Sequence, residues 1–395
     1  MTAEMGTGAI SPIIEATDRC TTKNYARFPL AFVRGRGCRL WTDDGREFLD
    51  LFAGLAVSSL GHGHPALVEA IRAQAGELLH TSNLYYHEPG ARLAEKLVAR
   101  TFADRVFFCN SGAEANEAAI KMARRAAGGR YKVVSVHRSF HGRTYGALAA
   151  TGQASLQEGF GPMPEGFVHV EPCSVDAVAA VVDGDTAAVL VEPIIGEGGI
   201  LVPPAGYLAA LREICDRHDV ALILDEVQTG NGRTGRLFAH EHDGIVPDIL
   251  TTAKGLAGGL PIGAVLARER YAAAFVPGSH GTTFGANPVA CAAASVVLDE
   301  LEGGVTANAA RVGDYFREEL TRALAGRNDV VEVRGKGLLL GVEFTREAKP
   351  LVLALLERGV ITNATAGTVL RLIPPLVLTE AEVDEGVAAL MEVLG

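Results

Sequence analysis

Two carboxylates and a lysine near the middle of the chain have the residue types and spacing for catalytic chemistry. The apolar run at 221–224 ends in Asp225 and Glu226, and Lys254 follows 29 positions after Asp225 (254 − 225), among threonines and glycines. A lysine amine can hold an aldehyde as a Schiff base, and an anion beside a pyridine nitrogen keeps that nitrogen protonated. Two charges about 3 Å apart, at an effective dielectric constant of about 20, attract each other by about 5 kcal/mol. The layout therefore suits an enzyme that uses pyridoxal phosphate.

An ordinary structural explanation for these three residues stays open at this point. An acidic pair at the end of a strand often begins a solvated loop, and a lysine in a glycine-rich stretch is usually exposed. The pyridoxal phosphate hypothesis therefore depends on the other polar motifs of the chain.

A phosphate site is suggested by NSGAEANEAAIK at 110–121, which directly follows an apolar strand. Ser111 and Glu114 have the spacing of a capping box, and Gly112 lets the backbone approach a ligand closely. The amides of Gly112 and Ala113 would then point out of a helix start, where a phosphate group fits. A well-capped helix without a ligand explains the same residues.

SFHGRT at 139–144 follows the next apolar strand, so it is expected at the same edge of the sheet. Phe140 could stack on a pyridine ring, and Arg143 could hold a carboxylate through two hydrogen bonds. His141 lacks partners at metal-ligand spacing and is interpreted as a neighbour in the same wall.

Further polar residues lie in later turns and strands. Glu197 lies in the glycine-rich turn of VEPIIGEGG at 191–199, where a carboxylate near an arginine either selects charge or forms an ordinary ion pair. Thr282 and Thr283 offer hydroxyl groups in GTTFGANP. Arg371 lies at a strand in RLIPPL and is either a salt-bridged strand end or the anchor of a substrate carboxylate.

Three other patterns are rejected as sites. GNGRTG at 230–235 matches a dinucleotide-binding pattern, but it neither follows a strand at once nor opens an apolar helix. HEHD at 240–243 and GHGHP at 61–65 contain histidines without metal-ligand spacing. The six cysteines show no C-x-x-C spacing. The sequence therefore predicts no metal site and no disulfide framework.

Composition limits the class of protein. With 395 residues, 48% of them hydrophobic, the chain can bury a large core and is expected to form two domains. The formal charge of −11, from 36 basic and 47 acidic residues without a clustered basic patch, argues against nucleic-acid binding. No apolar run reaches the ~20 residues that span a bilayer, and MTAEMGTGAI at the start does not resemble a signal peptide. We therefore expect a cytoplasmic protein that binds no membrane.

The elements that must position these residues form an α/β pattern. Strands that are apolar throughout alternate with helices, which predicts a mostly parallel sheet covered on both faces. A hairpin is expected around Asp44–Gly45, and a helix with a capping box is expected to begin near Thr379. The predicted strands are 106–109, 131–136, 187–191, 221–224 and 263–267, followed by strands within 330–344. The predicted domains are 1–55, an N-terminal arm and part of a small domain; 56–288, a large cofactor-binding domain; and 289–395, the rest of a discontinuous small α+β domain.

Taken together, the motifs resemble those of the fold-type I, class III (ω-amino acid) aminotransferases. They occur in the order of that family between about residues 25 and 376: SGAEANEAAIK, SFHGRT, VEPIIGEGG, LDEVQTGNGRTG, TTAKGLAGGLPIGA, GTTFGANP and RLIPPL. The resemblance implies a large domain with a mostly parallel sheet of the seven-stranded type, a small domain, and pyridoxal 5′-phosphate as cofactor. Ile195 departs from the family, which usually has glutamine there.

The resemblance also implies roles for the cofactor-binding residues. Lys254 would hold the cofactor covalently and then move a proton, while Asp225 pairs with the pyridine nitrogen. Val227 and Phe140 would enclose the ring, and Gln228 would reach its phenolic oxygen. The predicted catalytic residues are Lys254 and Asp225, and the predicted cofactor-binding residues are Ser111, Gly112, Ala113, Phe140, Asp225, Glu226, Val227, Gln228, Lys254 and Thr283.

Substrate roles follow from the same resemblance. Thr283 would come to the phosphate from the neighbouring subunit, which implies a homodimer with shared active sites. Arg143 and Thr282 would contact the amine donor. Arg371 would take the α-carboxylate of glutamate when Glu197 releases it.

Within the class, HTSNLYYHEPGARLAEKL at 80–97 most resembles the enzymes that act on N2-acetyl-L-ornithine. The implied reaction is a ping-pong transfer of the terminal amine to 2-oxoglutarate, giving glutamate, as a step of arginine biosynthesis. Other amine donors stay open, namely ornithine, 4-aminobutyrate and succinyl-diaminopimelate. An aminomutase and a non-catalytic protein that binds pyridoxal phosphate are further alternatives.

Overall fold

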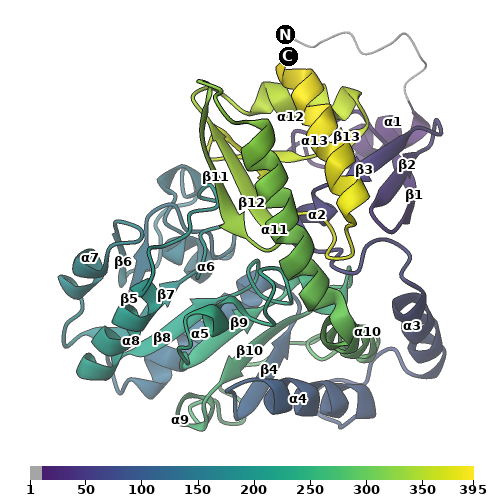
Figure 1. The fold of residues 1–395 in the computed structure, drawn as a ribbon. Coiled ribbons are helices and arrows are strands. Elements are labelled where there is room, and N and C mark those ends of the chain that lie inside the picture. Colours follow the sequence, from purple (N-terminus) through teal and green to yellow (C-terminus); the bar gives the residue numbers. More distant parts are fainter. Residues whose placement is uncertain (1–10) are drawn as a thin grey trace.

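A seven-stranded sheet forms the centre of the larger part of the molecule in the computed structural model, which describes residues 11–395 (Figure 1). Its strands are β4 (Arg105–Cys109), β5 (Lys132–Val136), β6 (Phe167–Val170), β7 (Thr186–Val191), β8 (Ala221–Asp225), β9 (Ile249–Thr252) and β10 (Gly263–Ala267). They are ordered β4-β10-β9-β8-β7-β5-β6. The strands from β9 to β6 pair in parallel, and β10 pairs antiparallel with β4 and β9. The predicted mostly parallel sheet is confirmed.

The strands are mostly apolar because both faces of the sheet are covered. Every residue of β7, β8, β9 and β10 is buried. Alternate residues of a strand point to opposite faces. Leu190 and Ile223 accordingly pack with alanines of helix α5 (Gly112–Ala126), whereas Val189 and Leu222 pack with helix α8 (Tyr207–His218). A pattern of continuous hydrophobicity therefore identifies β7, β8 and β10 correctly.

The remaining helices pack around the large sheet or lie in the smaller part of the molecule. Helix α10 packs against α3 and α4, and the long α11 continues from it toward the C-terminal strands (Figure 1). Their bounds are α1 (Pro12–Cys20), α2 (Ala53–Ala56), α3 (Pro65–Glu77), α4 (Glu88–Arg100), α6 (Tyr145–Ala150), α7 (Val175–Ala179), α9 (Glu269–Ala272), α10 (Pro288–Glu300), α11 (Thr306–Ala323), α12 (Lys349–Glu357) and α13 (Glu380–Leu394). The predicted capping box at the start of α13 is present, since Thr379 and Glu382 bond reciprocally.

Two four-stranded sheets make up the smaller part. One contains β11 (Val330–Lys336), β12 (Leu339–Phe344), β15 (Val369–Leu372) and β14 (Asn363–Thr365), paired antiparallel in that order. The other contains β1 (Phe32–Arg36), β2 (Arg39–Thr42), β3 (Glu47–Asp50) and β13 (Val360–Ile361). The β2–β3 hairpin confirms the predicted turn at Asp44–Gly45.

The pairing of β13 with β3 is parallel and joins the beginning of the chain to its end. A small domain built from both ends therefore has structural support, while its boundaries at residues 55 and 288 stay a prediction. The first ten residues, MTAEMGTGAI, which the prediction assigned to the N-terminal arm, lie outside the described residues.

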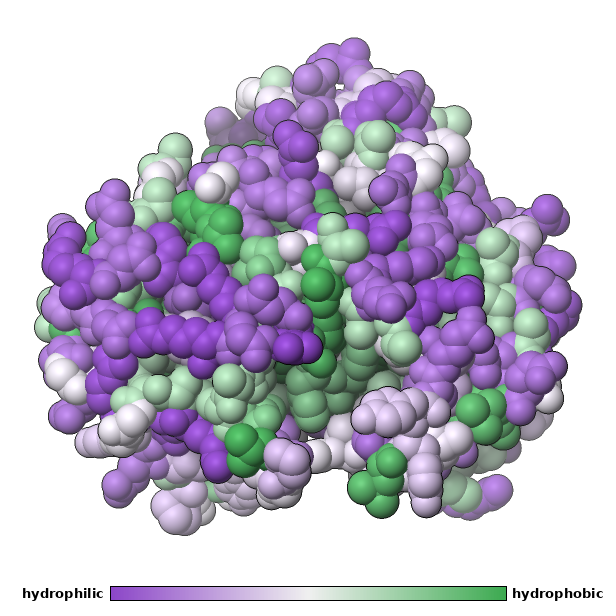
Figure 2. Space-filling view, turned by 90° about the horizontal axis from the view of Figure 1, so that it is seen from below, coloured by the Kyte–Doolittle hydropathy of each residue, from purple (hydrophilic) through white to green (hydrophobic). Residues whose placement is uncertain are grey.

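Within residues 11–395 there is no helix whose length and hydrophobicity would allow it to cross a lipid bilayer. On the face seen from below, hydrophobic residues gather in the middle and hydrophilic residues border them (Figure 2). An exposed apolar area of this kind is a common binding surface for a partner.

Candidate active site

A cavity of about 390 Å³ lies at the carboxyl ends of the central strands. Its walls come from the segments that follow β4, β5, β7, β8 and β9, because the ends of parallel strands meet at one edge of a sheet. Most of the predicted site residues line it: Ser111, Gly112, Ala113, Phe140, Arg143, Glu197, Asp225, Val227, Gln228 and Lys254. The sequence motifs therefore converge on one cavity.

Lys254 directly follows the short loop after β9 and lines the cavity. Its φ of 43° lies in the left-handed region, which costs a residue with a side chain about 1 kcal/mol. Burial lowers the pKa of the Lys254 amine, and the carboxylate of Glu197 partly opposes that shift. A lowered pKa increases the fraction of free amine, which is the nucleophilic form.

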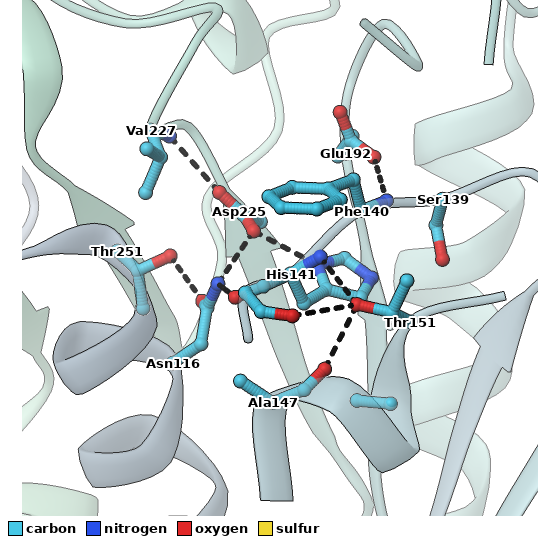
Figure 3. Close-up of polar contacts among 12 residues, drawn as sticks. Asn116, Ser139, Phe140, His141, Ala147, Thr151, Glu192, Asp225, Val227 and Thr251 are labelled. Carbon is cyan, nitrogen blue, oxygen red and sulfur yellow. Dashed lines mark hydrogen bonds and ion pairs between the residues drawn. The ribbon is translucent and has the colours of Figure 1, made fainter. Parts of the chain in front are cut away.

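Asp225 is buried at the end of β8 and is surrounded by donors (Figure 3). Its Oδ2 accepts hydrogen bonds from Asn116 Nδ2 at 2.7 Å and from His141 Nδ1 at 2.8 Å. Its Oδ1 accepts one from the Val227 backbone N–H at 3.0 Å. Asn116 is itself fixed, because its Oδ1 accepts from the Thr251 hydroxyl at 2.8 Å. The carboxylate is thus a fixed negative charge in the wall of the cavity.

Asn116 belongs to the site although no sequence motif predicts a role for it. Asn116 is buried on a face of α5 that otherwise carries alanines, including Ala115, Ala118 and Ala119. Buried amides are rare unless they are hydrogen-bonded. A lone asparagine on an apolar helix face was therefore the available signal.

Glu192 connects two loops of the cavity wall. Its carboxylate accepts hydrogen bonds from the backbone N–H groups of Phe140 at 2.9 Å and Gly196 at 3.0 Å. Burial raises the pKa of Glu192 to about 7, and the nearby charge of Asp225 adds to that shift. Glu192 therefore links the loop that carries Phe140 to the turn that carries Glu197.

The start of α5 differs in one respect from the predicted capping box. The Ser111 hydroxyl accepts from the Glu114 N–H at 3.2 Å, as expected. The Glu114 carboxylate accepts instead from the backbone N–H and the side-chain amide of Asn110, at 2.9 and 2.8 Å. The Glu114 carboxylate bonds Asn110 instead of the Ser111 backbone because Asn110 offers two N–H donors, whereas the Ser111 backbone offers one.

Gly112 is required by close packing at this helix start. A Cβ at Gly112 would lie 2.7 Å from Val227 Cγ1, so a side chain could not fit without displacing Val227. The first backbone N–H groups of a helix have no partner within the helix. The start of α5 is therefore an available anion site at the cavity wall.

Glu197 and Arg371 form an ion pair at the side of the cavity nearest the smaller sheets. Arg371 Nη1 donates to Glu197 Oε1 at 2.5 Å, and Gln228 Nε2 donates to the same oxygen at 3.4 Å. Burial alone would raise the pKa of Glu197, but the charge of Arg371 and its hydrogen bond outweigh that effect and lower it. Glu197 lines the cavity, whereas the buried Arg371 lies outside the lining. Glu197 therefore stands between the cavity and the arginine.

Three other predicted site residues also lie outside the cavity lining. The Glu226 carboxylate is buried and accepts from the backbone N–H groups of Ala239 and His240, at 2.6 and 2.9 Å, so it holds the following loop. Thr282 and Thr283 lie in the turn before α10, and Thr283 is exposed.

The rejected motifs have other contacts. Residues 230–235 form turns, in which the buried Arg233 donates to the carbonyl oxygens of Leu338 and Pro374. His240 bonds Glu226. Across residues 11–395, no group of three or more histidine, cysteine, aspartate or glutamate side chains could hold a metal ion.

The family model named Aminotransferase class-III matches residues 20–394. The chain belongs to the class III aminotransferases. This aminotransferase is 52% identical over 376 residues to the acetylornithine aminotransferase of Mycobacterium bovis, an alignment that covers 94% of this chain and 93% of the relative. It is 50% identical over 377 residues to the acetylornithine aminotransferase of Caldanaerobacter subterraneus subsp. tengcongensis, covering 94% and 96%.

A solved structure gives the same fold. The ornithine aminotransferase of Toxoplasma gondii superposes on this aminotransferase with a TM-score of 0.93 at 36% identity, covering 96% of this chain and 93% of that one. That structure has partial occupancy of PLP, pyridoxal phosphate, at its active site.

The cavity of this aminotransferase fits pyridoxal phosphate. It combines a lysine amine, a buried carboxylate and a helix start that can bind a phosphate group. The Gln228 Oε1 is buried, and no residue in the range 11–395 bonds to it. A polar group of a ligand in the cavity can complete that bonding.

Proposed function

We propose that this class III aminotransferase transfers the terminal amine of N2-acetyl-L-ornithine to 2-oxoglutarate by a ping-pong mechanism. Relatives that are 50 and 52% identical over 94% of the chain are named acetylornithine aminotransferases. The observation that carries the proposal is the Glu197–Arg371 pair at the wall of the cavity that contains Lys254. A covered arginine suits an enzyme that must accept both a terminal amine and an α-amino dicarboxylic acid.

Pyridoxal phosphate, when bound, accepts the amine and withdraws electrons from the carbon that carries it. In the proposed mechanism, Lys254 Nζ would hold the cofactor, would take the proton that the carbon of the amine donor loses, and would later deliver a proton to the α-carbon of 2-oxoglutarate. Asp225, oriented by Asn116 and His141, would supply the negative charge that keeps the ring nitrogen protonated. Phe140 and Val227 are positioned to contact the ring within the cavity wall.

The two substrates make different demands on the same cavity. While Glu197 pairs with Arg371, the pair has no net charge, and the free ω-amine of acetylornithine can enter without a carboxylate on that side. Glutamate and 2-oxoglutarate bring an α-carboxylate that replaces Glu197 on the guanidinium. The exposed Arg143, whose Cζ lies 5.7 Å from the centre of the Phe140 ring, is available for the carboxylate of acetylornithine.

A panel of amine donors with saturating 2-oxoglutarate tests the proposed substrate. We expect kcat/KM for N2-acetylornithine to exceed that for ornithine and 4-aminobutyrate by at least about tenfold. Free ornithine must bring a second charged amine into the site. A buried polar group without a matching partner weakens binding by about 1–3 kcal/mol. A clear preference for ornithine would contradict the proposal in favour of the second candidate, an ornithine aminotransferase, which the structural similarity supports.

The same assay separates the remaining alternatives. Turnover without any 2-oxoglutarate would identify an aminomutase. An absorbance band at ~420 nm that does not change when amine donors are added would identify a non-catalytic protein that binds pyridoxal phosphate. The cytoplasmic location stays a prediction.

We also infer a homodimer with shared active sites. Leu84 and Tyr86 are 85 and 105% exposed, and Phe284 is 61% exposed. Asn83 Nδ2 donates to the carbonyl oxygens of Thr282 and Gly285, which brings these two exposed segments together. Large exposed apolar side chains in one place mark a partner interface. Such an interface could bring the exposed Thr283 to the cavity of the partner.

Sedimentation velocity tests the dimer. The wild-type enzyme is expected to sediment at about twice the chain mass of 41.4 kDa. A Leu84→Asp/Tyr86→Asp variant is expected to sediment as a monomer with little activity, because charge disrupts an apolar interface. Val331→Asp, which alters a residue 59% exposed on β11, is the control and should remain dimeric. A monomeric wild-type enzyme at micromolar concentration would refute the dimer.

A further inference from the structure

Arg371 is held by Asn363 as well as by Glu197. In the antiparallel pairing of β14 with β15, Asn363 lies directly opposite Arg371. Its Oδ1 accepts hydrogen bonds from Arg371 Nε at 3.1 Å and from Nη2 at 2.7 Å. On the other side, the partner of Arg371 in β12 is Gly341, which has no side chain to offer. The register of the sheet therefore gives the guanidinium one cross-strand side-chain contact.

The two acceptors use different parts of the guanidinium group. An arginine has five N–H donors in a planar fork. Asn363 occupies the edge formed by Nε and Nη2, whereas Glu197 accepts from Nη1. The edge formed by Nη1 and the second hydrogen of Nη2 remains for a carboxylate that binds through two oxygens. Glu197, which lines the cavity, stands on that side.

Asn363 differs from Glu197 in charge. An amide oxygen accepts hydrogen bonds without carrying a net charge, so it fixes the position of an arginine and leaves its positive charge uncompensated. A carboxylate at the same position would form a buried ion pair and reduce the attraction for a substrate carboxylate. An asparagine therefore meets two requirements that neither alanine nor aspartate meets together.

The same strand also holds the backbone beside Glu197. The Thr365 hydroxyl donates to the main-chain oxygen of Glu197. Thr365 lies two residues after Asn363, so the three-residue strand β14 contacts both members of the ion pair. The Glu197 side chain can leave Arg371 by rotation about its own bonds while its main chain keeps this contact.

We propose that Asn363 is a positioning residue that holds Arg371 by its Nε–Nη2 edge. When the Glu197 side chain leaves, the guanidinium keeps its place and its charge for the α-carboxylate of a dicarboxylic acid substrate. This inference rests on one part of the proposed function, namely that the enzyme uses 2-oxoglutarate. It does not depend on which amine donor the enzyme prefers.

Titration of the holoenzyme with glutarate tests this role without turnover. Glutarate is a five-carbon dicarboxylate that lacks the keto group, and isothermal titration calorimetry measures its Kd. Asn363→Ala is expected to raise that Kd by about tenfold or more, because two hydrogen bonds that orient a charged group are lost. Asn363→Asp is expected to raise it at least as much while the melting temperature stays at or above the wild-type value, because an ion pair replaces the amide contact.

Asn308→Ala is the matched control. Asn308 is also half-buried in the C-terminal region, and its Nδ2 donates to the carbonyl oxygens of Leu376 and Leu378, at 2.8 and 3.0 Å. This variant loses these two hydrogen bonds and the one that Asn308 Oδ1 accepts from Arg311 Nη2, but none to Arg371, so its Kd for glutarate should equal that of the wild-type enzyme. In Asn363→Ala, KM for 2-oxoglutarate should rise in parallel with Kd, while KM for the amine donor stays within about twofold.

Four results would overturn the proposal. An Asn363→Ala variant with a glutarate Kd within about twofold of the wild-type value would exclude positioning by Asn363. An equal rise in Asn308→Ala would show a general loss of stability, and unchanged binding by Asn363→Asp would refute the argument from charge. Failure of the wild-type enzyme to bind glutarate would refute both this proposal and the use of 2-oxoglutarate, whereas preference for another amine would refute only the proposed donor.

Discussion

Lys254→Ala is expected to abolish transamination and to leave the fold intact. Lys254 supplies both a nucleophile and a proton carrier in the proposed mechanism, and proton transfer by a positioned group alone contributes about two to four powers of ten to the rate. A fall in kcat of at least about four powers of ten should follow, measured by single-turnover and steady-state kinetics. The Lys254 side chain lines the cavity, so its loss should leave the fold intact.

The control for this variant is Lys96→Ala. Lys96 lies on α4 and donates to the carboxylate of Asp299, outside the cavity. Its loss should change the melting temperature slightly and kcat not at all. Reduction of the wild-type enzyme with borohydride, followed by peptide mapping, should place a pyridoxyl label on Lys254. Full turnover in Lys254→Ala, or a label elsewhere, would contradict the assignment.

Asp225→Asn is expected to lower kcat by about three powers of ten or more. The attraction between two charges about 3 Å apart, about 5 kcal/mol at an effective dielectric constant of about 20, is then lost. Asparagine keeps the size of the side chain and an oxygen that can accept from the Val227 N–H, so the fold should persist. Steady-state kinetics on the holoenzyme, with cofactor content checked by absorbance, would measure the effect.

Asp248→Asn provides the matched control. Asp248 is also a buried aspartate and accepts from Arg212 Nη1 at 2.7 Å and from the Leu222 N–H at 2.9 Å, but it does not line the cavity. Its substitution should cost stability, because it breaks a buried ion pair, and leave kcat unchanged. Equal rates for wild type and Asp225→Asn would remove the argument that this carboxylate keeps the ring nitrogen charged.

Strands of the large sheet could be predicted from the sequence where they are apolar throughout, which happens when both faces of the strand are buried. The run at 221–224 and the one at 263–267 are examples, and the latter matches β10 to the residue. β6 and β9 were missed. β6 contains His169, and β9 ends in Thr251 and Thr252, so neither reads as a continuous apolar run.

The site could be predicted in its residue types but not in its contacts. Lys254 and Asp225 stand in motifs whose order along the chain is informative, and both line the cavity. The resemblance placed Glu226 among the cofactor-binding residues, and in the structure its carboxylate bonds the backbone of the loop at 239–240. Adjacent residues at the end of a strand point in opposite directions, and this alternation separates the two carboxylates.

Some side-chain contacts between separate segments of the chain could not be predicted from the sequence. Asn363 meets Arg371 because two short strands pair in one register, and a shift of one residue would turn its side chain to the other face. Arg233 likewise reaches the carbonyl oxygens of Leu338 and Pro374 across more than 100 positions of sequence. Such partners become visible only when the folded chain is known.

The pairing of β3 with β13 affects the order in which the chain can fold during its synthesis. The seven-stranded sheet lies within residues 105–267, so all of its strands have been synthesised before the last 128 residues of the chain (395 − 267) are made. The sheet that contains β3 needs Val360 and Ile361 for its last strand. The N-terminal hairpin must therefore wait for almost the whole polypeptide to be translated before its sheet is complete.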